Sequence, residues 1–254
     1  MEYVDINEAI KAPGLRIVLV RGFPSPWGQA AKAMIEYKGL QYLAAPQQAM
    51  GANPELVAWS GVNSGPVVAW NEEQPLNRWN DILHLLERLA PAKPLVPEDP
   101  AARVHLFGLA HEICGEVGFG WNRRLDMVRP AMTSGKADPG SAGFANKYGY
   151  NDADGALATR RTVAFLRYLT NILKAQRDKG SDYLIGNSVT AADFYWAAFS
   201  NLAVIQAPEE CPLADAIRPM FENVPLEVAA AVDPILIEHR DRVMRAYFKL
   251  PMEL

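Results

Sequence analysis

The chain has 254 residues, of which 50% are hydrophobic and 21% are charged, and its formal net charge is -4. This length accommodates two domains of ordinary size, and the composition is that of a folded chain rather than a disordered one. The mildly acidic balance gives no electrostatic reason to expect nucleic acid or an anionic membrane surface as a partner.

The cysteines and the N-terminal residues indicate the cellular compartment in which the protein is expected. Cys114 and Cys211 are far apart, so we expect neither a disulfide framework nor a metal cluster, and we assign no metal. Glu2, Asp5 and Glu8 stand where a signal peptide would have a basic start and an apolar run. No stretch reaches the roughly 18 apolar residues of a membrane span. We therefore expect a cytoplasmic protein without a membrane segment.

The first elements in the chain are a strand and a helix. Residues 15–20 are rich in β-branched side chains and closed by Gly22, which predicts a buried strand. Apolar residues at helical spacing predict a helix up to Gly39, and Ser25 followed by Pro26 is a typical helix start. The next predicted elements are a strand at 41–45, a short helix at 54–59, a strand at 65–70, a hairpin turn at 71–74 and a helix from Leu76.

A proline-rich segment separates these elements from a helical region. Residues 91–100 contain Pro91, Pro94, Pro97 and Pro100, which is typical of a stiff linker. We therefore predict a domain at 1–90 and a second, all-helical domain at 101–254. Helices are predicted at 101–128, 153–179, 191–205 and 234–249, and the Gly-, Ser- and Asp-rich residues 133–152 predict a long loop.

Three segments carry a resemblance to a known family. They are Ser25-Pro26-Trp27-Gly28, Gly65-Pro66-Val67-Val68, and Gly186-Asn187-Ser188-Val189-Thr190-Ala191-Ala192-Asp193. With the order of elements, they resemble the cytosolic glutathione transferases, as an atypical member that we assign to no class. The resemblance implies a thioredoxin-like α/β N-terminal domain and an all-α helical-bundle C-terminal domain. In the third segment, Ser188 or Thr190 can cap the helix that follows, with Asp193 in its first turn.

The resemblance also implies glutathione as co-substrate, and it implies a role for Ser25 and Trp27 of the first segment and for Gly65 and Pro66 of the second. Ser25 would donate a hydrogen bond to the sulfur of glutathione and stabilise its thiolate, whereas the alternative is that Ser25 only caps the helix. Trp27 would line the thiol pocket, or belong to the core. Gly65 would offer its backbone to the cysteinyl part of glutathione, and Pro66 would be a cis-proline.

One segment departs from the family pattern. Where the family has Glu/Gln-Ser to hold the γ-glutamyl end of glutathione, this chain has Arg78-Trp79. Arg78, Trp79 and Asn80 are therefore either an altered ligand clamp or ordinary first-turn residues, with Asn77 as the cap.

The predicted helix at 101–128 contains several glycines, which disfavour helix. They provide close helix packing or, alternatively, space for a second substrate beside Phe119, Trp121 and Asn122. The neighbouring Arg123, Arg124 and Arg129 are predicted to form a solvated face, with attraction of an anionic ligand as the alternative. Cys114 is predicted to be a small buried hydrophobe rather than a nucleophile.

We therefore predict a glutathione S-transferase-like enzyme. Its thiolate chemistry would be conjugation of a small hydrophobic electrophile, or thiol-dependent cleavage of an ether or halide. The resemblance implies a detoxifying homodimer. The alternative is a binding or interaction protein of the same fold without glutathione catalysis, which the Arg78-Trp79 substitution favours.

Overall fold

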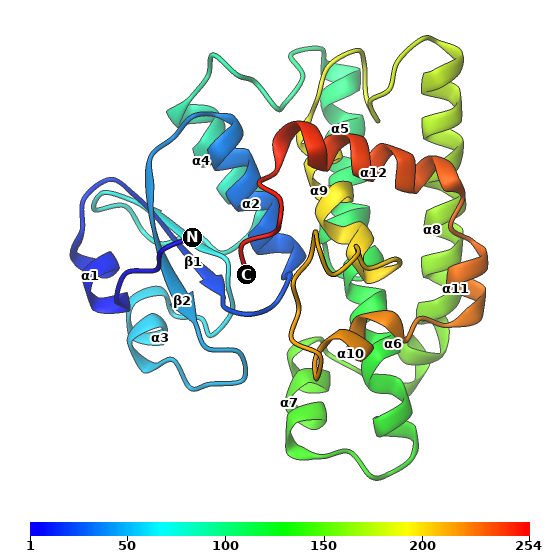
Figure 1. Ribbon diagram of the computed structural model, residues 1–254, viewed down its shortest axis with the longest axis horizontal. Coiled ribbons are helices and arrows are strands. Elements are labelled where there is room, and N and C mark those ends of the chain that lie inside the picture. Colours follow the sequence, from blue (N-terminus) through cyan, green and yellow to red (C-terminus); the bar gives the residue numbers. More distant parts are fainter. The chain divides into compact units, whose positions relative to one another are not determined.

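A computed structural model describes residues 1–254, and its chain divides into two compact units. The first unit contains Met1–Val96, and the second contains Pro97–Ile205 and Asp215–Asp241. Two segments from late in the chain, Gln206–Ala214 and Arg242–Leu254, belong to the first unit. The sequence analysis did not anticipate these returning segments. Figure 1 labels the elements of both units.

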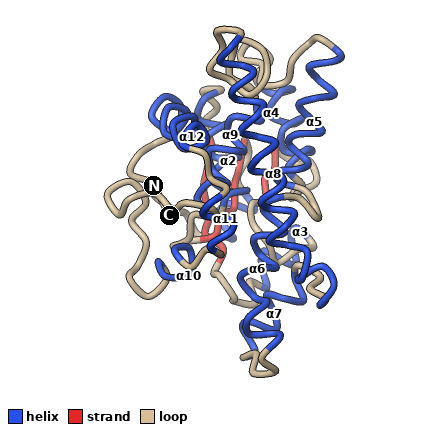
Figure 2. The backbone as a smooth tube through the Cα atoms, turned by 90° about the vertical axis from the view of Figure 1, so that its right-hand side faces the viewer, coloured by secondary structure: helices blue, strands red, loops and turns tan.

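The first unit is built on a three-stranded mixed sheet, drawn in red in Figure 2. The strand order is β2-β1-β3, in which β1 runs parallel to β2 and antiparallel to β3. This order confirms the predicted strand-helix-strand beginning of the chain. The elements are α1 (Ile6–Lys11), β1 (Leu15–Val20), α2 (Pro26–Tyr37), β2 (Tyr42–Gln47), α3 (Pro54–Ser60), β3 (Val67–Trp70) and α4 (Trp79–Leu89).

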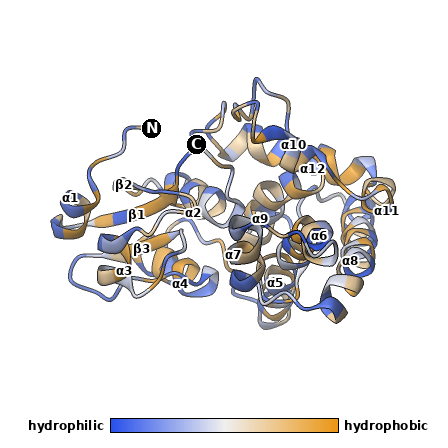
Figure 3. Cartoon of the chain, turned by 90° about the horizontal axis from the view of Figure 1, so that it is seen from below, coloured by the Kyte–Doolittle hydropathy of each residue, from blue (hydrophilic) through white to orange (hydrophobic).

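Burial explains why these segments form a sheet covered by helices. The central strand β1 is buried from Leu15 to Leu19, and Figure 3 shows β1 and β3 coloured mostly as hydrophobic. Helix α2 approaches β1 closely, since a Cβ on Gly28 would lie 2.9 Å from Leu19 Cδ2. Helices α1 and α3 add side chains to a core cluster around Val18 and Val67.

The predicted hairpin after β3 is confirmed as a turn, but the returning segment does not form a fourth strand. It pairs with β3 at one bridge, in which Val68 and Leu76 exchange backbone hydrogen bonds of 2.8 Å in both directions. The helix expected from Leu76 begins instead at Trp79. Leu76 is held in the bridge, so the chain becomes helical only after it leaves the sheet.

The second unit is helical, as predicted. Its elements are α5 (Pro100–Cys114), α6 (Phe119–Thr133), α7 (Pro139–Lys147), α8 (Asp152–Asp178), α9 (Ala191–Phe199), the 3₁₀ helix η1 (Ser200–Leu202), α10 (Arg218–Glu222) and α11 (Leu226–Ala230). Helix α12 (Pro234–Tyr247) begins in this unit and ends in the first one. No helix of the chain combines the length and the apolar composition that crossing a membrane requires.

Helix α9 is the core of the second unit, because all of its residues are buried. Phe119 of α6 packs against Trp196 of α9 with ring centroids 5.5 Å apart, and against Phe165 of α8 at 5.8 Å. Thr190 is the N-cap of α9 and forms a capping box with Asp193. The capping role predicted for Ser188 or Thr190 therefore falls to Thr190.

The single helix predicted at 101–128 was wrong, because the structure divides it into α5 and α6 at residues 115–118. The Gly115 N–H donates to His111 O at 2.7 Å and closes α5. A Cβ on Gly118 would lie 2.7 Å from Glu112 O and 2.8 Å from His111 O, so no larger residue fits this tight connection. The glycines thus allow a sharp reversal that continuous helical periodicity does not reveal.

The long loop predicted at 133–152 was also wrong, because it contains α7. Asp138 caps this helix by accepting hydrogen bonds from Gly140 N at 2.9 Å and Ser141 N at 3.1 Å, and Pro139 occupies the first turn. Glycine and serine lower helix propensity, so composition alone favoured a loop. The start signal Asp-Pro identifies the helix better than the composition does.

Replacing either of two glycines in the second unit with alanine is expected to change the stability of the fold, in opposite directions. A Cβ on Gly120 would overlap the ring of Phe199, whereas a Cβ on Gly108 would meet nothing within 4 Å. We expect Gly120→Ala to destabilise the fold by about 1–3 kcal/mol through overpacking. Gly108→Ala should stabilise it by up to about 1 kcal/mol, because alanine is the better helix former. Urea denaturation of both variants checks this, and equal shifts would contradict the packing account.

Candidate active site

Three chain segments meet at one edge of the sheet in the first unit. In β1 and β2, which are parallel, Val20 is paired with Gln47 at their carboxyl ends. The antiparallel strand β3 begins at this edge, where Val67 is paired with Val18. A Cβ on Gly65 would lie 3.6 Å from Val20 Cγ2, so the residues before β3 continue beside the end of β1. In open α/β sheets, ligands bind outside the carboxyl ends of the strands.

Ser25 stands at the start of α2, five residues after β1 ends at this edge. Its residue is the N-cap of α2, but its side chain makes no capping hydrogen bond, and Pro26 supplies the first helical position. The alternative interpretation required the hydroxyl of this half-buried residue to cap the helix, and the hydroxyl does not do so. A free hydroxyl at a helix N-terminus can donate to an anion, which the helix dipole also stabilises.

Trp27 lies in the first turn of α2 and is half-buried. Only Pro26 separates it from Ser25, so the indole and the hydroxyl start from the same turn. A contact role for Trp27 stays a prediction.

The Gly65–Pro66 peptide bond is cis, as predicted for Pro66. The Gly65 N–H donates to Gln47 Oε1 at 2.6 Å, and Gln47 Nε2 donates to Asn63 O at 3.1 Å. A Cβ on Gly65 would lie 3.2 Å from Val18 O, so a side chain would crowd the strand. The N–H of Gly65, one of the two backbone polar groups that this residue could offer to glutathione, is thus occupied by a side chain of the protein.

Gln47 is the site residue that the sequence analysis missed. It is buried at 5% exposure and ends β2 directly beside Gly65. The available signal was a polar residue at the end of a predicted strand, and the predicted strand ended two residues before it.

Arg78, Trp79 and Asn80 begin α4 at the same edge of the sheet. The antiparallel bridge pairs Val68 with Leu76, so continuing its register brings Arg78 alongside Pro66. Arg78 is the N-cap residue of α4, which corrects the expectation that Asn77 would be the cap. Arg78 makes no side-chain cap and forms no ion pair, and its side chain is exposed. A guanidinium beside a helix N-terminus can bind a carboxylate.

The C-terminal segment holds α2 in place. Glu253 Oε2 lies 2.8 Å from the Nζ of the buried Lys32, and Gln29 Nε2 donates to Glu253 O at 3.2 Å. Burial raises the pKa of Glu253, but Lys32, the terminal ammonium of Met1 and Lys249 outweigh it and lower the pKa to about 2. The helix that begins at Ser25 is therefore anchored by a charged network inside the first unit.

The residues predicted to contact a second substrate lie in the second unit and have structural partners. Phe119 is fully buried, and Asn122 is 1% exposed and donates to Val117 O and, at 2.9 Å, to Gly118 O. Trp121 is half-buried and its Nε1–H donates to Tyr148 O at 2.9 Å. These contacts favour the packing interpretation of the glycine-rich segment around them.

The solvated arginine face predicted for Arg123, Arg124 and Arg129 was wrong for two of its members. Arg123 is fully buried, with Nε donating to Leu202 O at 2.9 Å and Nη1 pairing with Asp126 at 2.8 Å. Arg124 is 7% exposed and lies over the rings of Phe144 and Phe221. Their stems are apolar, which allows burial when partners meet the guanidinium. Cys114 is buried, which raises the pKa of its thiol and agrees with the predicted structural role.

Comparison with known proteins finds a family match for part of the chain. Residues 141–225 match the family described as glutathione S-transferase, C-terminal domain. No curated protein matches the sequence at a significant level. 

Solved structures of glutathione S-transferases share the fold over most of the chain. The enzyme from Methylobacterium radiotolerans, in complex with glutathione sulfonate, has a TM-score of 0.62 and 17% identity over 92% of each chain. The enzyme from Methylobacillus flagellatus, with glutathione bound, has a TM-score of 0.62 and 15% identity over 95% of this chain and 100% of its own. Rice GST1, in complex with glutathione, has a TM-score of 0.59 and 17% identity over 95% and 94%. The chain therefore has the fold of the glutathione S-transferases, and its residues 141–225 match the C-terminal domain of that family.

Proposed function

We propose that the protein is a glutathione-dependent transferase that binds glutathione at the edge of the sheet beside which Ser25, Gly65 and Arg78 lie. The observation that carries this proposal is the Ser25 hydroxyl, which stands at the N-terminus of α2 without capping it. Solved relatives contain glutathione or glutathione sulfonate, which supports the same ligand here.

In the proposed reaction, the glutathione thiol releases its proton to solvent as Ser25 donates a hydrogen bond to the sulfur. The thiolate then attacks an electrophilic carbon of a small hydrophobic substrate. In a conjugation by addition, a C–S bond forms and the substrate takes up a proton. In ether or halide cleavage, the C–S bond forms while the bond to the leaving oxygen or halide breaks. The protein's part is to lower the pKa of the thiol and to orient it.

Arg78 would take the place of the family's Glu/Gln-Ser clamp. Its exposed guanidinium can bind the carboxylate of the γ-glutamyl end, where the N-terminus of α4 adds favourable partial charge. Trp79 and Asn80 follow it in the first turn of the same helix. The pose of glutathione would then differ from the family's at this end, with an electrostatic contact in place of a serine hydroxyl.

The resemblance extends the proposal to a cytoplasmic homodimer that takes part in detoxification. It also assigns residues 1–90 as the glutathione-binding domain and 101–254 as the helical domain, with 91–100 as the linker. The net charge of -4 supports the expectation of no nucleic acid and no membrane as partner.

A titration with glutathione tests the ligand and its clamp together. We expect heat of binding in isothermal calorimetry with the native chain, and a roughly tenfold weaker dissociation constant for Arg78→Gln, because one charge-assisted contact is lost. Arg88→Gln is the matched control, since Arg88 lies on the same helix but pairs with Glu73 on the exposed surface. No heat at millimolar glutathione would overturn the proposal, and equal weakening in both variants would overturn the role of Arg78.

A second candidate is a binding or interaction protein of this fold that has lost glutathione catalysis. The hydrogen bond from Gly65 N to Gln47 Oε1 favours it, because that N–H is already satisfied inside the protein. For glutathione to use this group, the buried Gln47 side chain has to give up its bond. A Gln47→Ala variant separates the two: it should bind glutathione at least as tightly as the native chain if the ligand uses the Gly65 N–H.

A further inference from the structure

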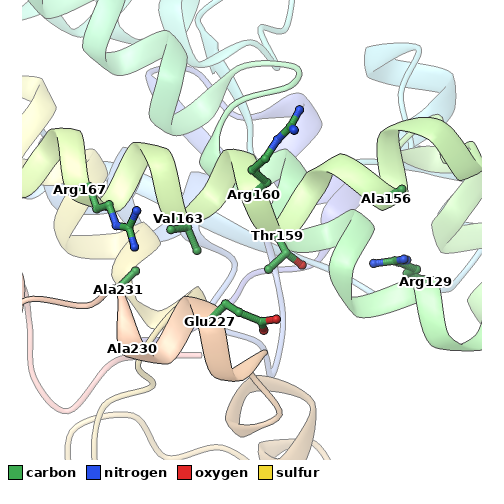
Figure 4. Close-up of a pocket in the computed structure, with 9 residues that line it drawn as sticks. All are labelled: Arg129, Ala156, Thr159, Arg160, Val163, Arg167, Glu227, Ala230 and Ala231. Carbon is green, nitrogen blue, oxygen red and sulfur yellow. The ribbon is translucent and has the colours of Figure 1, made fainter.

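A pocket of about 620 Å³ lies in the second unit between α6, α8 and α11 (Figure 4). Ser25 and Arg78 belong to the first unit, so the pocket shares no residue with the candidate active site. Its volume is in the range of small-molecule sites. Three arginines line it, Arg129 from α6 and Arg160 and Arg167 from α8, with Glu227 of α11 as the only acidic residue. The formal charge of its lining is therefore positive in a chain whose net charge is -4.

The two α8 arginines of this pocket, Arg160 and Arg167, are unpaired, in contrast to the other basic residues of α8. Arg161 pairs with Asp154, Lys174 with Asp233 and Arg177 with Glu238, at 2.8, 2.6 and 2.6 Å. Arg160 and Arg167 form no ion pair or hydrogen bond, although they belong to the same helix. The basic residues of α8 that face the pocket are thus the ones left without a carboxylate.

Nearby acidic groups do not neutralise the pocket. Asp126, which interacts electrostatically with Arg129, already accepts hydrogen bonds from Arg123 Nη1 and Thr159 Oγ1, both at 2.8 Å. Glu227 forms no ion pair with any of the arginines. In Figure 4 the Glu227 carboxylate faces Thr159 in the middle of the pocket, between Arg129 at one end and Arg167 at the other.

The charged side chains that line the pocket are thus positive at its two ends and negative at its centre. The Arg160 side chain points away from α11 in Figure 4, so Arg129 and Arg167 are the groups that close the ends. Between them the walls are Val163 and alanine side chains of α8 and α11. From Thr159 to Arg167 the helix rises about 12 Å, which an extended small molecule can follow.

We propose that this pocket binds a linear organic dianion, a dicarboxylate whose two acid groups are separated by an uncharged chain. Arg129 binds one carboxylate and Arg167 the other, since guanidinium groups bind carboxylates through paired hydrogen bonds. The uncharged chain lies against Val163 and the alanines. Glu227 repels a negative charge at the centre and so excludes compact anions that would place one there.

Calorimetric titration of the full chain with suberate, succinate and octanoate tests the proposal. We expect suberate to bind more tightly than octanoate, which has the same number of carbons but one acid group, and than succinate, which is too short to reach both ends. Binding should weaken as salt is added, because exposed charges are screened.

Variants identify the groups responsible. Arg129→Gln and Arg167→Gln should each weaken suberate binding by about 10- to 100-fold. Arg177→Gln, on the same helix but paired with Glu238 outside the pocket, should leave it unchanged. Glu227→Gln should tighten binding by a few-fold, a gain that a misfolded variant cannot produce. Suberate bound no more tightly than octanoate, or bound equally by Arg167→Gln and the native chain, would overturn the proposal; neither result bears on glutathione binding in the first unit.

Discussion

Replacing Ser25 with alanine is expected to lower kcat/KM for glutathione conjugation by about 10²-fold while leaving the fold intact. A positioned hydrogen-bond donor to a developing anion contributes catalysis of this order. The structure separates this effect from stability, because the Ser25 side chain makes no hydrogen bond to the helix that it precedes. We therefore expect the free energy of unfolding to change by no more than about 0.5 kcal/mol. Steady-state kinetics with a chromogenic electrophile and urea denaturation provide the two readings.

The pH profile distinguishes a role in thiolate formation from a role in shape. If the hydroxyl stabilises the thiolate, Ser25→Ala should raise the apparent pKa of bound glutathione, so that activity recovers at higher pH. Ser25→Thr retains a hydroxyl at the same position and should restore part of the rate. Unchanged turnover in Ser25→Ala would show that the hydroxyl has no part in the chemistry.

Much of the first unit could be predicted from the sequence because its signals are local. The β-branched run 15–20, the Ser25-Pro26 helix start and Pro66 each fix a short piece of backbone, and the structure contains all three. The order of these pieces, also read from the residues, was part of what pointed to the family resemblance. Such signals place a residue at the end of a strand or helix, which is where the candidate site lies.

The contacts that modify the site are not local, and the sequence did not reveal them. Gln47 reaches Gly65 across 18 positions, and Glu253 reaches Lys32 from the other end of the chain. Likewise Arg123 is buried because Leu202 and Asp126 provide acceptors, one of them 79 positions away. A pattern of charges on a helix predicts a solvated face unless tertiary partners are known, which is why the arginine cluster was misjudged.

The second large effect is expected at Asp193, the last residue of the family motif. Asp193 is fully buried and accepts hydrogen bonds from Leu184 N at 2.9 Å, Thr190 N at 2.8 Å and Thr190 Oγ1 at 3.0 Å. Its Oδ1 also lies 2.8 Å from His239 Nε2 of α12. One carboxylate thus joins the start of α9, the segment before it and a helix 46 positions later.

Asp193→Ala should destabilise the chain by about 3–5 kcal/mol, because it leaves several buried donors without an acceptor. Glu238→Ala is the matched control: Glu238 neighbours His239 on α12, but its ion pair with Arg177 is on the exposed surface and contributes less than about 1 kcal/mol. Urea denaturation followed by circular dichroism measures both. His239→Ala should fall between them, since Asp193 then keeps its backbone donors. Equal midpoints for Asp193→Ala and Glu238→Ala would contradict the proposed role, whereas the expected order makes this motif residue a structural centre of the helical unit rather than part of its chemistry.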